Sequence, residues 1–99
     1  MSFVTAQPES LAAAAGRLQQ IGSTLTAQHA ATATPLTGVM PAAADEVSIL
    51  TAAKFATHAQ TFQSISAQAA AMHQLLVATL ETSAGSYAAT EASNAAAAR

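Results

Sequence analysis

Apolar residues recur along this 99-residue chain at alternating intervals of three and four, the spacing that places side chains on one face of an α-helix. Pro8 and Glu9 suit a first helical turn, because proline is tolerated there and a carboxylate favours the positive end of the helix dipole. The sequence therefore predicts a helix that begins at Pro8. Its repeating seam comprises Leu11, Ala14, Leu18, Ile21, Leu25, Gln28 and Thr32.

Two glycines, Gly16 and Gly22, interrupt this first helix. Each costs roughly 1 kcal/mol in a helix interior relative to alanine. Gly22 lies near the edge of the seam, where a missing side chain lets a neighbouring backbone approach closely. Pro35, Gly38 and Pro41 then cluster and predict a turn at about residues 35–41.

A second helix is predicted from Pro41 or Ala42 to about Ala84, with Gly85 as its stop. Its large apolar residues form one stripe, with His58 near the centre. Leu50, Leu75 and Val77 broaden the stripe to roughly half of the helix circumference. A single antiparallel neighbour needs less than that, so the width of the stripe predicts two neighbours. The stripe comprises Val47, Phe55, Phe62, Ile65, Ala69, Met72, Leu76 and Leu80.

The pattern predicts an all-α fold, an antiparallel two-helix hairpin. Two slender, alanine-rich helices bury little apolar surface against each other, so we expect a partner helical pair to complete a four-helix bundle. A second copy of the chain is an equal alternative from periodicity alone. We expect the core and interface contacts from Leu11, Leu18, Ile21, Leu25, Val47, Phe55, His58, Phe62, Ile65, Ala69, Met72 and Leu76.

Charge is scarce in this chain. Charged residues make up 8% of it, against about 25% in an ordinary soluble domain, and the net charge is -2. This balance excludes an electrostatic footprint for nucleic acid or an anionic membrane surface. The run from Phe55 to Leu80 has no formal charge, but its glutamines and histidines disfavour a membrane span. Cysteine is absent, which excludes disulfides and thiolate metal sites.

The histidines do not predict a catalytic or metal site. His58 and His73 are 15 residues apart, roughly 22 Å along one helix, and neither has a His or Glu partner one turn away. An approach of His29 to one of them across the hairpin would supply only two ligands, which do not make a metal site. A two-helix hairpin also offers no enclosed pocket for a triad. We therefore expect no catalytic residue, no metal and no cofactor.

After Gly85 the chain has no strongly apolar residue beyond Tyr87, so residues 85–99 are predicted to be a flexible tail following a hairpin domain of residues 1–84. Tyr87 and Glu91 are four residues apart and would share one face of a helix. Taken by itself, such a pair is more readily explained as incidental.

Four blocks of this sequence resemble the mycobacterial PE family. The first is Pro8-Glu9, and the second is the stretch 41–48, Pro-Ala-Ala-Ala-Asp-Glu-Val-Ser, which opens the second helix. The others are the stretch 55–59, Phe-Ala-Thr-His-Ala, and the stretch 87–91, Tyr-Ala-Ala-Thr-Glu. The resemblance covers essentially the whole chain, and the combined positions of the blocks make it specific.

This resemblance implies functions that the composition does not show. PE domains pair with PPE proteins as four-helix bundles, which favours the heterodimer over the homodimer. The pairs are exported by type VII (ESX) secretion with a signal of the form Tyr-x-x-x-Asp/Glu, which maps here onto Tyr87 and Glu91. An EspG-type chaperone in the cytosol holds such pairs through the PPE subunit. The resemblance therefore implies a non-enzymatic protein that is transiently cytoplasmic and then secreted or displayed at the cell surface.

Overall fold

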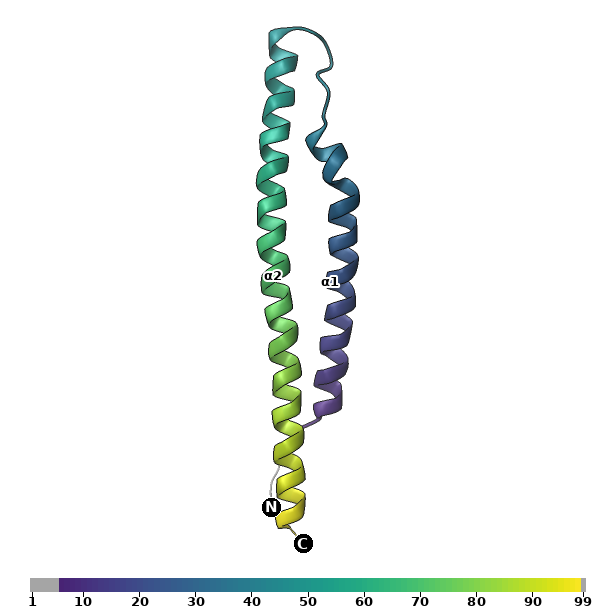
Figure 1. Cartoon of the computed structure of the whole chain (residues 1–99), viewed down its shortest axis with the longest axis vertical. Coiled ribbons are helices and arrows are strands. Elements are labelled where there is room, and N and C mark those ends of the chain that lie inside the picture. The colour runs from purple at the N-terminus through teal and green to yellow at the C-terminus, as the bar shows by residue number, and fades with distance from the viewer. Residues whose placement is uncertain (1–5, 99) are drawn as a thin grey trace. The chain divides into compact units, whose positions relative to one another are not determined.

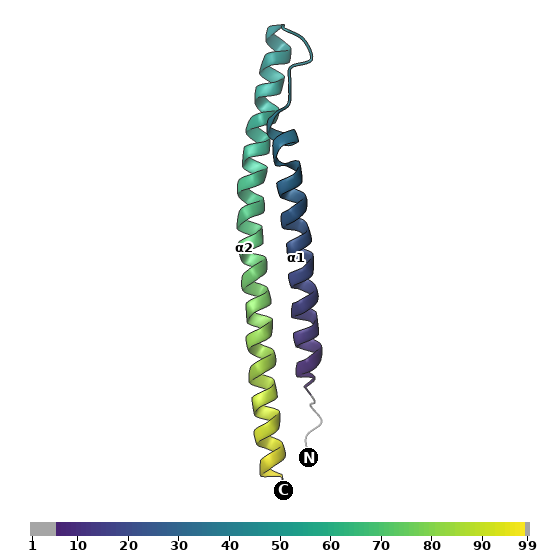
Figure 2. The same cartoon turned by 45° about the vertical axis from the view of Figure 1, so that its right-hand side comes forward.

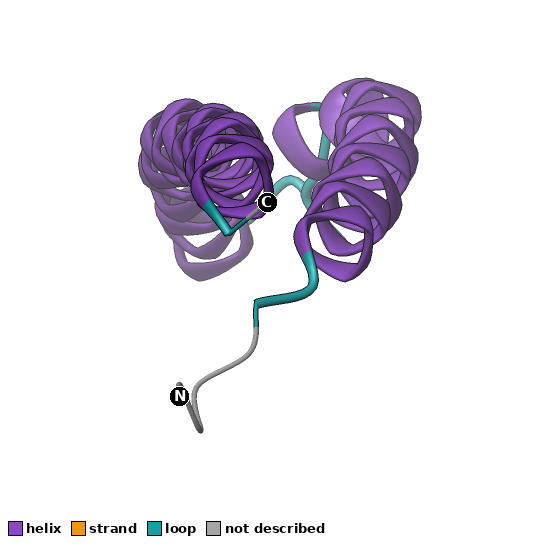
Figure 3. Cartoon of the chain, turned by 90° about the horizontal axis from the view of Figure 1, so that it is seen from below, coloured by secondary structure: helices purple, strands orange, loops and turns teal. Residues whose placement is uncertain are grey.

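The computed structural model describes residues 6–98, which form two long helices (Figures 1 and 3). Helix α1 spans Pro8–Thr37, helix α2 spans Glu46–Ala97, and residues 38–45 connect them. No strand occurs between residues 6 and 98. These two helices are consistent with the predicted helical hairpin.

The chain divides into two compact units, each of which combines a part of α1 with a part of α2. Unit 1 contains residues 1–22 and 72–99, and unit 2 contains residues 23–71. Within each unit the α1 segment runs alongside the α2 segment in the opposite direction, as both side views show (Figures 1 and 2). Each unit is therefore an antiparallel helical pair.

Helix α1 begins at the predicted residue but ends later than predicted. Its start at Pro8 is supported by the Gln7 carbonyl, which accepts hydrogen bonds from the N–H groups of Ser10 and Leu11. The helix continues through Pro35, so the turn lies at residues 38–45 rather than 35–41. Pro35 is in the last turn, where the loss of one backbone donor is tolerated more easily than in a helix interior. The Thr37 hydroxyl donates to the Ala33 carbonyl at 2.9 Å and helps to close that turn.

Helix α2 begins at Glu46, four or five residues later than predicted, because Asp45 caps it. The Asp45 carboxylate accepts hydrogen bonds from the Ser48 backbone N–H at 2.8 Å and from the Ser48 hydroxyl at 2.9 Å. Aspartate in this position satisfies one of the free N–H groups at a helix start. These two bonds from Ser48 hold the pKa of Asp45 below its ordinary value.

The predicted stop at Gly85 is wrong. Helix α2 continues through Gly85 to Ala97, so the stretch expected to be a flexible tail is helical up to that residue. A glycine that ends a helix usually adopts the left-handed conformation, and no described glycine has a positive φ. Alanines on both sides of Gly85 favour continuation of the helix.

The residues of α2 that face α1 are mostly small. Buried and half-buried positions recur along α2 at intervals of three and four, which is the seam of an antiparallel helical pair. We call these positions the inner row of α2. It comprises Ser48, Ala52, Ala56, Ala59, Gln63, Ser66, Ala70, His73, Val77, Leu80 and Ala84.

The inner row of α1 differs from the predicted seam. The fully buried residue is Ala15, whereas Ala14 is exposed, and Gly22 takes the place predicted for Ile21. Leu11 and Leu18 are half-buried, as a seam position requires. The seam of α1 therefore keeps Leu11 and Leu18, whereas at the other positions it lies one residue later than predicted, where small residues allow the two helices to approach closely. The inner row of α1 comprises Pro8, Leu11, Ala15, Leu18, Gly22, His29 and Ala33.

Replacing Ala15 with Leu should destabilise unit 1, since Ala15 has 0% exposure and leaves no room for a longer side chain. Overpacking of this kind costs typically about 1–3 kcal/mol. Thermal unfolding of the full chain, in the assembly in which it purifies, would measure the loss. The matched control is Ala13→Leu, which adds the same atoms at an exposed position about 200° around the helix from Ala15. Equal stability of the two variants would contradict the assigned seam.

Replacing Asp45 with Ala should loosen the start of α2, whereas Asp45→Asn should keep the cap, because the amide oxygen still accepts the Ser48 bonds. The pKa of Asp45 is lowered on folding, so its stabilising effect is full above the ordinary value of 3.8 and is lost as the pH falls through the lowered pKa. Amide hydrogen exchange at residues 46–49 would report both effects. The same acid-induced loosening in the Asn variant would rule out Asp45 as its origin.

Candidate partner-binding surface

The side chains buried within each unit are small, and most of the large apolar ones are exposed. The buried set is Ala15, Val77 and Ala84 in unit 1 and Ala52 and Ala59 in unit 2. Four of these five are alanines. The exposed set is Ile21, Leu25, Leu36, Val39, Met40, Val47, Ile49, Leu50, Phe55, Phe62, Ile65, Met72, Leu75, Leu76 and Tyr87.

The exposed apolar residues of α2 include a second row beside the inner row. Each member of this outer row precedes an inner-row residue by one position, as Ile65 precedes Ser66. One residue corresponds to a rotation of about 100° around a helix. Helix α2 therefore presents two adjacent faces, a small-residue face that packs on α1 and a large-residue face that is exposed. The outer row comprises Val47, Phe55, His58, Phe62, Ile65, Ala69, Met72 and Leu76.

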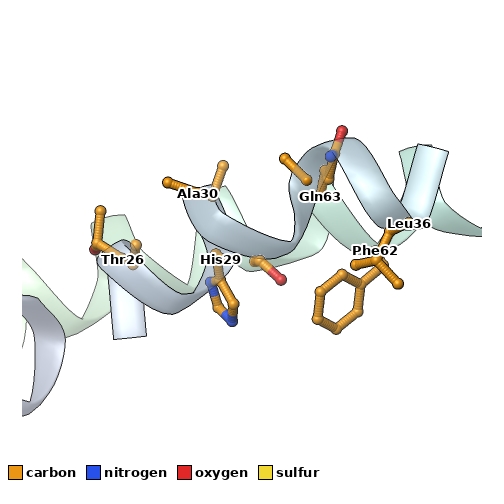
Figure 4. Close-up of a pocket in the computed structure, with 10 residues that line it drawn as sticks. Thr26, His29, Ala30, Leu36, Phe62 and Gln63 are labelled. Carbon is orange, nitrogen blue, oxygen red and sulfur yellow. The ribbon is translucent and has the colours of Figure 1, made fainter. Parts of the chain in front are cut away.

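In unit 2 a histidine of α1 contacts a phenylalanine of the outer row. The rings of His29 and Phe62 meet edge to face, with centroids 5.6 Å apart and an interplanar angle of 81°. Both rings lie on one side of the helical pair, opposite to Thr26, Ala30 and Gln63 (Figure 4). His29 thus contacts Phe62 rather than another histidine. Phe62 remains 48% exposed, so half of its surface is available to a partner.

A groove of about 370 Å³ runs between the two helices of unit 2. Its walls carry one imidazole and no carboxylate, ammonium or guanidinium group, so the groove does not provide the acid–base partners that a hydrolytic triad requires. Its chemistry is that of an apolar contact surface. The lining residues are Thr26, His29, Ala30, Ala33, Leu36, Phe62, Gln63, Ser66, Ala67 and Ala70 (Figure 4).

In unit 1 the outer row continues as Met72 and Leu76, both exposed. Because the two segments are antiparallel, the residue before an inner-row position lies on the same side of the pair in both helices. Ile21, which precedes Gly22, therefore shares this side with Met72 and Leu76. Tyr87 follows Leu76 by eleven residues, about three turns, and so faces the same direction. Unit 1 thus has one apolar side to which both helices contribute.

Tyr87 and Glu91 are exposed and lie one turn apart on α2, because α2 extends beyond Gly85. An aromatic ring and a carboxylate at this spacing share one helix face. The pair is accessible to another protein, and its role as a signal stays a prediction at this point.

The accessible area of the chain is larger than that of a compact monomer of the same mass. A compact monomer of 9.9 kDa exposes roughly 5,200 Å². This chain exposes 7676 Å², about 2,500 Å² more than that expectation. Obligate interfaces bury about 2,000–5,000 Å² counted over both partners, which is roughly 1,000–2,500 Å² on each. The excess area is therefore at the upper end of what one chain of a permanent complex buries.

The predicted contact residues fall into two groups. Leu11 and Leu18 lie in the seam of unit 1, whereas Ile21, Leu25 and the eight predicted residues of α2 are all exposed. Hydrophobicity missed the seam of α2 because alanine and serine contribute little to an apolar stripe. The small residues of α2 form a second repeat, one position after the large apolar residues, and this repeat is the sequence signal that indicates the seam. The missed seam residues include Ala15, Gly22, Ala52, Ala59, His73 and Ala84.

Two other kinds of feature are absent from the described part of the chain. No three His, Asp or Glu side chains of residues 6–98 come close enough together to hold a metal ion. None of the helices formed by these residues contains a segment sufficiently long and apolar to cross a lipid bilayer.

Comparison with known proteins gives one consistent family. Residues 4–94 match the model of the PE family. The chain is 66% identical over 98 residues to the PE family protein PE13 of Mycobacterium tuberculosis (strain ATCC 25618 / H37Rv), with 99% of both chains covered. It is 50% identical over 98 residues to PE8 of the same strain, covering 99% of this chain and 36% of PE8.

A third relative is the PE-PGRS family protein PE_PGRS33 of Mycobacterium tuberculosis (strain CDC 1551 / Oshkosh), which is 55% identical over 96 residues. That alignment covers 97% of this chain and 20% of the relative. The chain thus spans nearly all of one relative and only a part of two longer ones.

Proposed function

The chain belongs to the PE family of mycobacterial proteins, and on this premise we propose that it is a non-enzymatic subunit that pairs with a PPE protein and is exported by type VII secretion. Its two helices form one half of a four-helix bundle, and the PPE protein supplies the other half. The exposed outer row carries this proposal.

The geometry of α2 supports a bundle rather than an isolated hairpin. A helix in a four-helix bundle packs against two neighbours, so it needs two adjacent contact faces. The inner row of α2 occupies one face against α1, and the outer row lies about 100° away from it. Phe55 and Ile65 are 58% and 59% exposed, although burial of each would contribute about 1.5–3 kcal/mol. A partner helix laid on this face would recover that contribution.

The chemistry of the outer row indicates what the partner must present. His58 is the only polar residue of the outer row, and the row contains no carboxylate, lysine or arginine. A complementary surface is therefore apolar, and shape rather than charge selects the partner. A second copy of this chain also presents an apolar row, but membership of the PE family favours a PPE partner.

Tyr87 and Glu91 are proposed as the export signal, of the form Tyr-x-x-x-Glu. Their exposure and their position one turn apart on α2 support recognition of both side chains by one receptor surface. The proposal includes an EspG-type chaperone that holds the pair in the cytosol through the PPE subunit. Export then places the pair outside the cell or at the cell surface.

Replacing Ile65 with Asp should abolish co-purification with the PPE partner, because partner binding would bury an unpaired carboxylate. The matched control is Ser64→Asp, which introduces the same charge at the preceding exposed residue, outside both rows. Co-expression with candidate PPE proteins, followed by affinity purification, would measure the difference. Retention of the partner by the Ile65 variant would contradict the proposed interface, and a homodimer lost in that variant would favour self-assembly.

Replacing Tyr87 with Ala should leave the complex intact and stop its export, because the aromatic half of the signal is removed. The control is Ser86→Ala, which alters the adjacent exposed residue and leaves the signal unchanged. Immunoblots of cell pellet and culture filtrate would give the exported fraction of each variant. Normal export of the Tyr87 variant would show that this residue is not part of the signal.

A further inference from the structure

A histidine of α2 packs directly onto the backbone of α1 in unit 1. The His73 Nε2–H donates a hydrogen bond to the Leu18 carbonyl at 2.5 Å, and the imidazole lies over Gly22. A Cβ atom at Gly22 would lie 2.8 Å from His73 Cδ2 and 2.9 Å from Nε2, closer than real Cβ contacts. The ring therefore occupies the space that any other residue at position 22 would fill.

The Leu18 carbonyl, which accepts the hydrogen bond, and Gly22, which has no side chain, are neighbours on the surface of α1. In an α-helix the carbonyl of residue 18 points toward residue 22, four positions later. A side chain at residue 22 would shield that carbonyl from a neighbouring helix. Gly22 is thus what allows the His73 ring to reach a backbone acceptor.

Other registers of the two helices do not offer this site. A slip of one heptad would place His73 opposite Ala15, which carries a Cβ atom, or opposite His29, which carries a ring. At the other glycine of α1, Gly16, no neighbouring atom lies within 4 Å of the place that a Cβ atom would occupy, so no side chain of α2 packs there. Only one alignment of the helices therefore satisfies the His73 ring.

The other seam residues of unit 1 make non-directional contacts. On α2 they are Val77, Leu80 and Ala84, which are all apolar, so a shift by one heptad leaves none of them without a hydrogen-bond partner. A buried polar residue in an otherwise uniform seam is a known means of fixing helix register. We infer that His73 and Gly22 together form a register lock, which sets the axial alignment of α1 and α2 in unit 1.

The lock can be tested by distance measurement, because the chain has no native cysteine to interfere. Spin labels at the exposed positions Gln19 and Ser86, each changed to Cys, lie at different levels along the helix axis and would report the alignment within unit 1. The measurement uses the full chain in the assembly in which it purifies. The parent should give one distance. Gly22→Ala and His73→Ala should each add a second population, displaced along the helix axis by about 10 Å for a slip of one heptad.

The control is Gly16→Ala, which adds the same methyl group to α1 in open space and should retain the single parent distance. His73→Gln should restore it in part, since the glutamine amide can also donate to the Leu18 carbonyl. A single parent distance in His73→Ala would overturn the lock. Should Gly22→Ala not fold, the His73→Ala measurement decides alone, because truncation at residue 73 introduces no clash.

Discussion

The close approach of α1 and α2 through small side chains is the constraint on which the rest of the structure depends. In unit 2 the facing positions are mostly alanine or serine, and in unit 1 small residues alternate with Leu11, Leu18, Val77 and Leu80. Four of the five buried residues of the two units are alanines. A seam of this kind leaves no space between the helices for phenylalanine or isoleucine. The large side chains therefore remain on the outside, where Phe55, Ile65 and Met72 are all more than half exposed. Association with another protein would remove this apolar surface from water, and the proposed function rests on that gain.

The two rows of α2 divide the work of folding and recognition. The inner row packs on α1, and the outer row, one residue earlier, is exposed and is proposed to contact a partner. Because the rows are adjacent on one helix, a partner laid on the outer row would also contact the same side of α1, where Ile21 lies. The fold and the proposed function thus follow from one arrangement on α2: its small residues face α1, and its large residues lie about 100° around the helix from them. The inferred His73–Gly22 lock adds one directional contact to the largely apolar seam of unit 1.

Much of the helical architecture could be predicted from the sequence, and the reasons for the failures are physical. Pro8 marked the start of α1 correctly, and the apolar stripe on α2 was found because its members are large. The seam of α2 was missed because alanine contributes little hydrophobicity, although burial of alanine is what permits close packing. Gly85 was expected to stop α2, yet a glycine stops a helix only when it adopts the left-handed conformation, which no described glycine does. Contacts such as His29–Phe62 and His73–Leu18 join residues distant in sequence, so no local pattern predicts them.

The most direct test of this account is the behaviour of the isolated chain in dilute solution. Sedimentation equilibrium combined with thermal unfolding followed by circular dichroism would give its oligomeric state and its cooperativity together. The account predicts that the chain alone self-associates or unfolds over a broad range of temperature, and that a PPE partner converts it into a complex with one sharp transition. A monomer that unfolds cooperatively without a partner would contradict the central claim, since its exposed outer row would then need no cover.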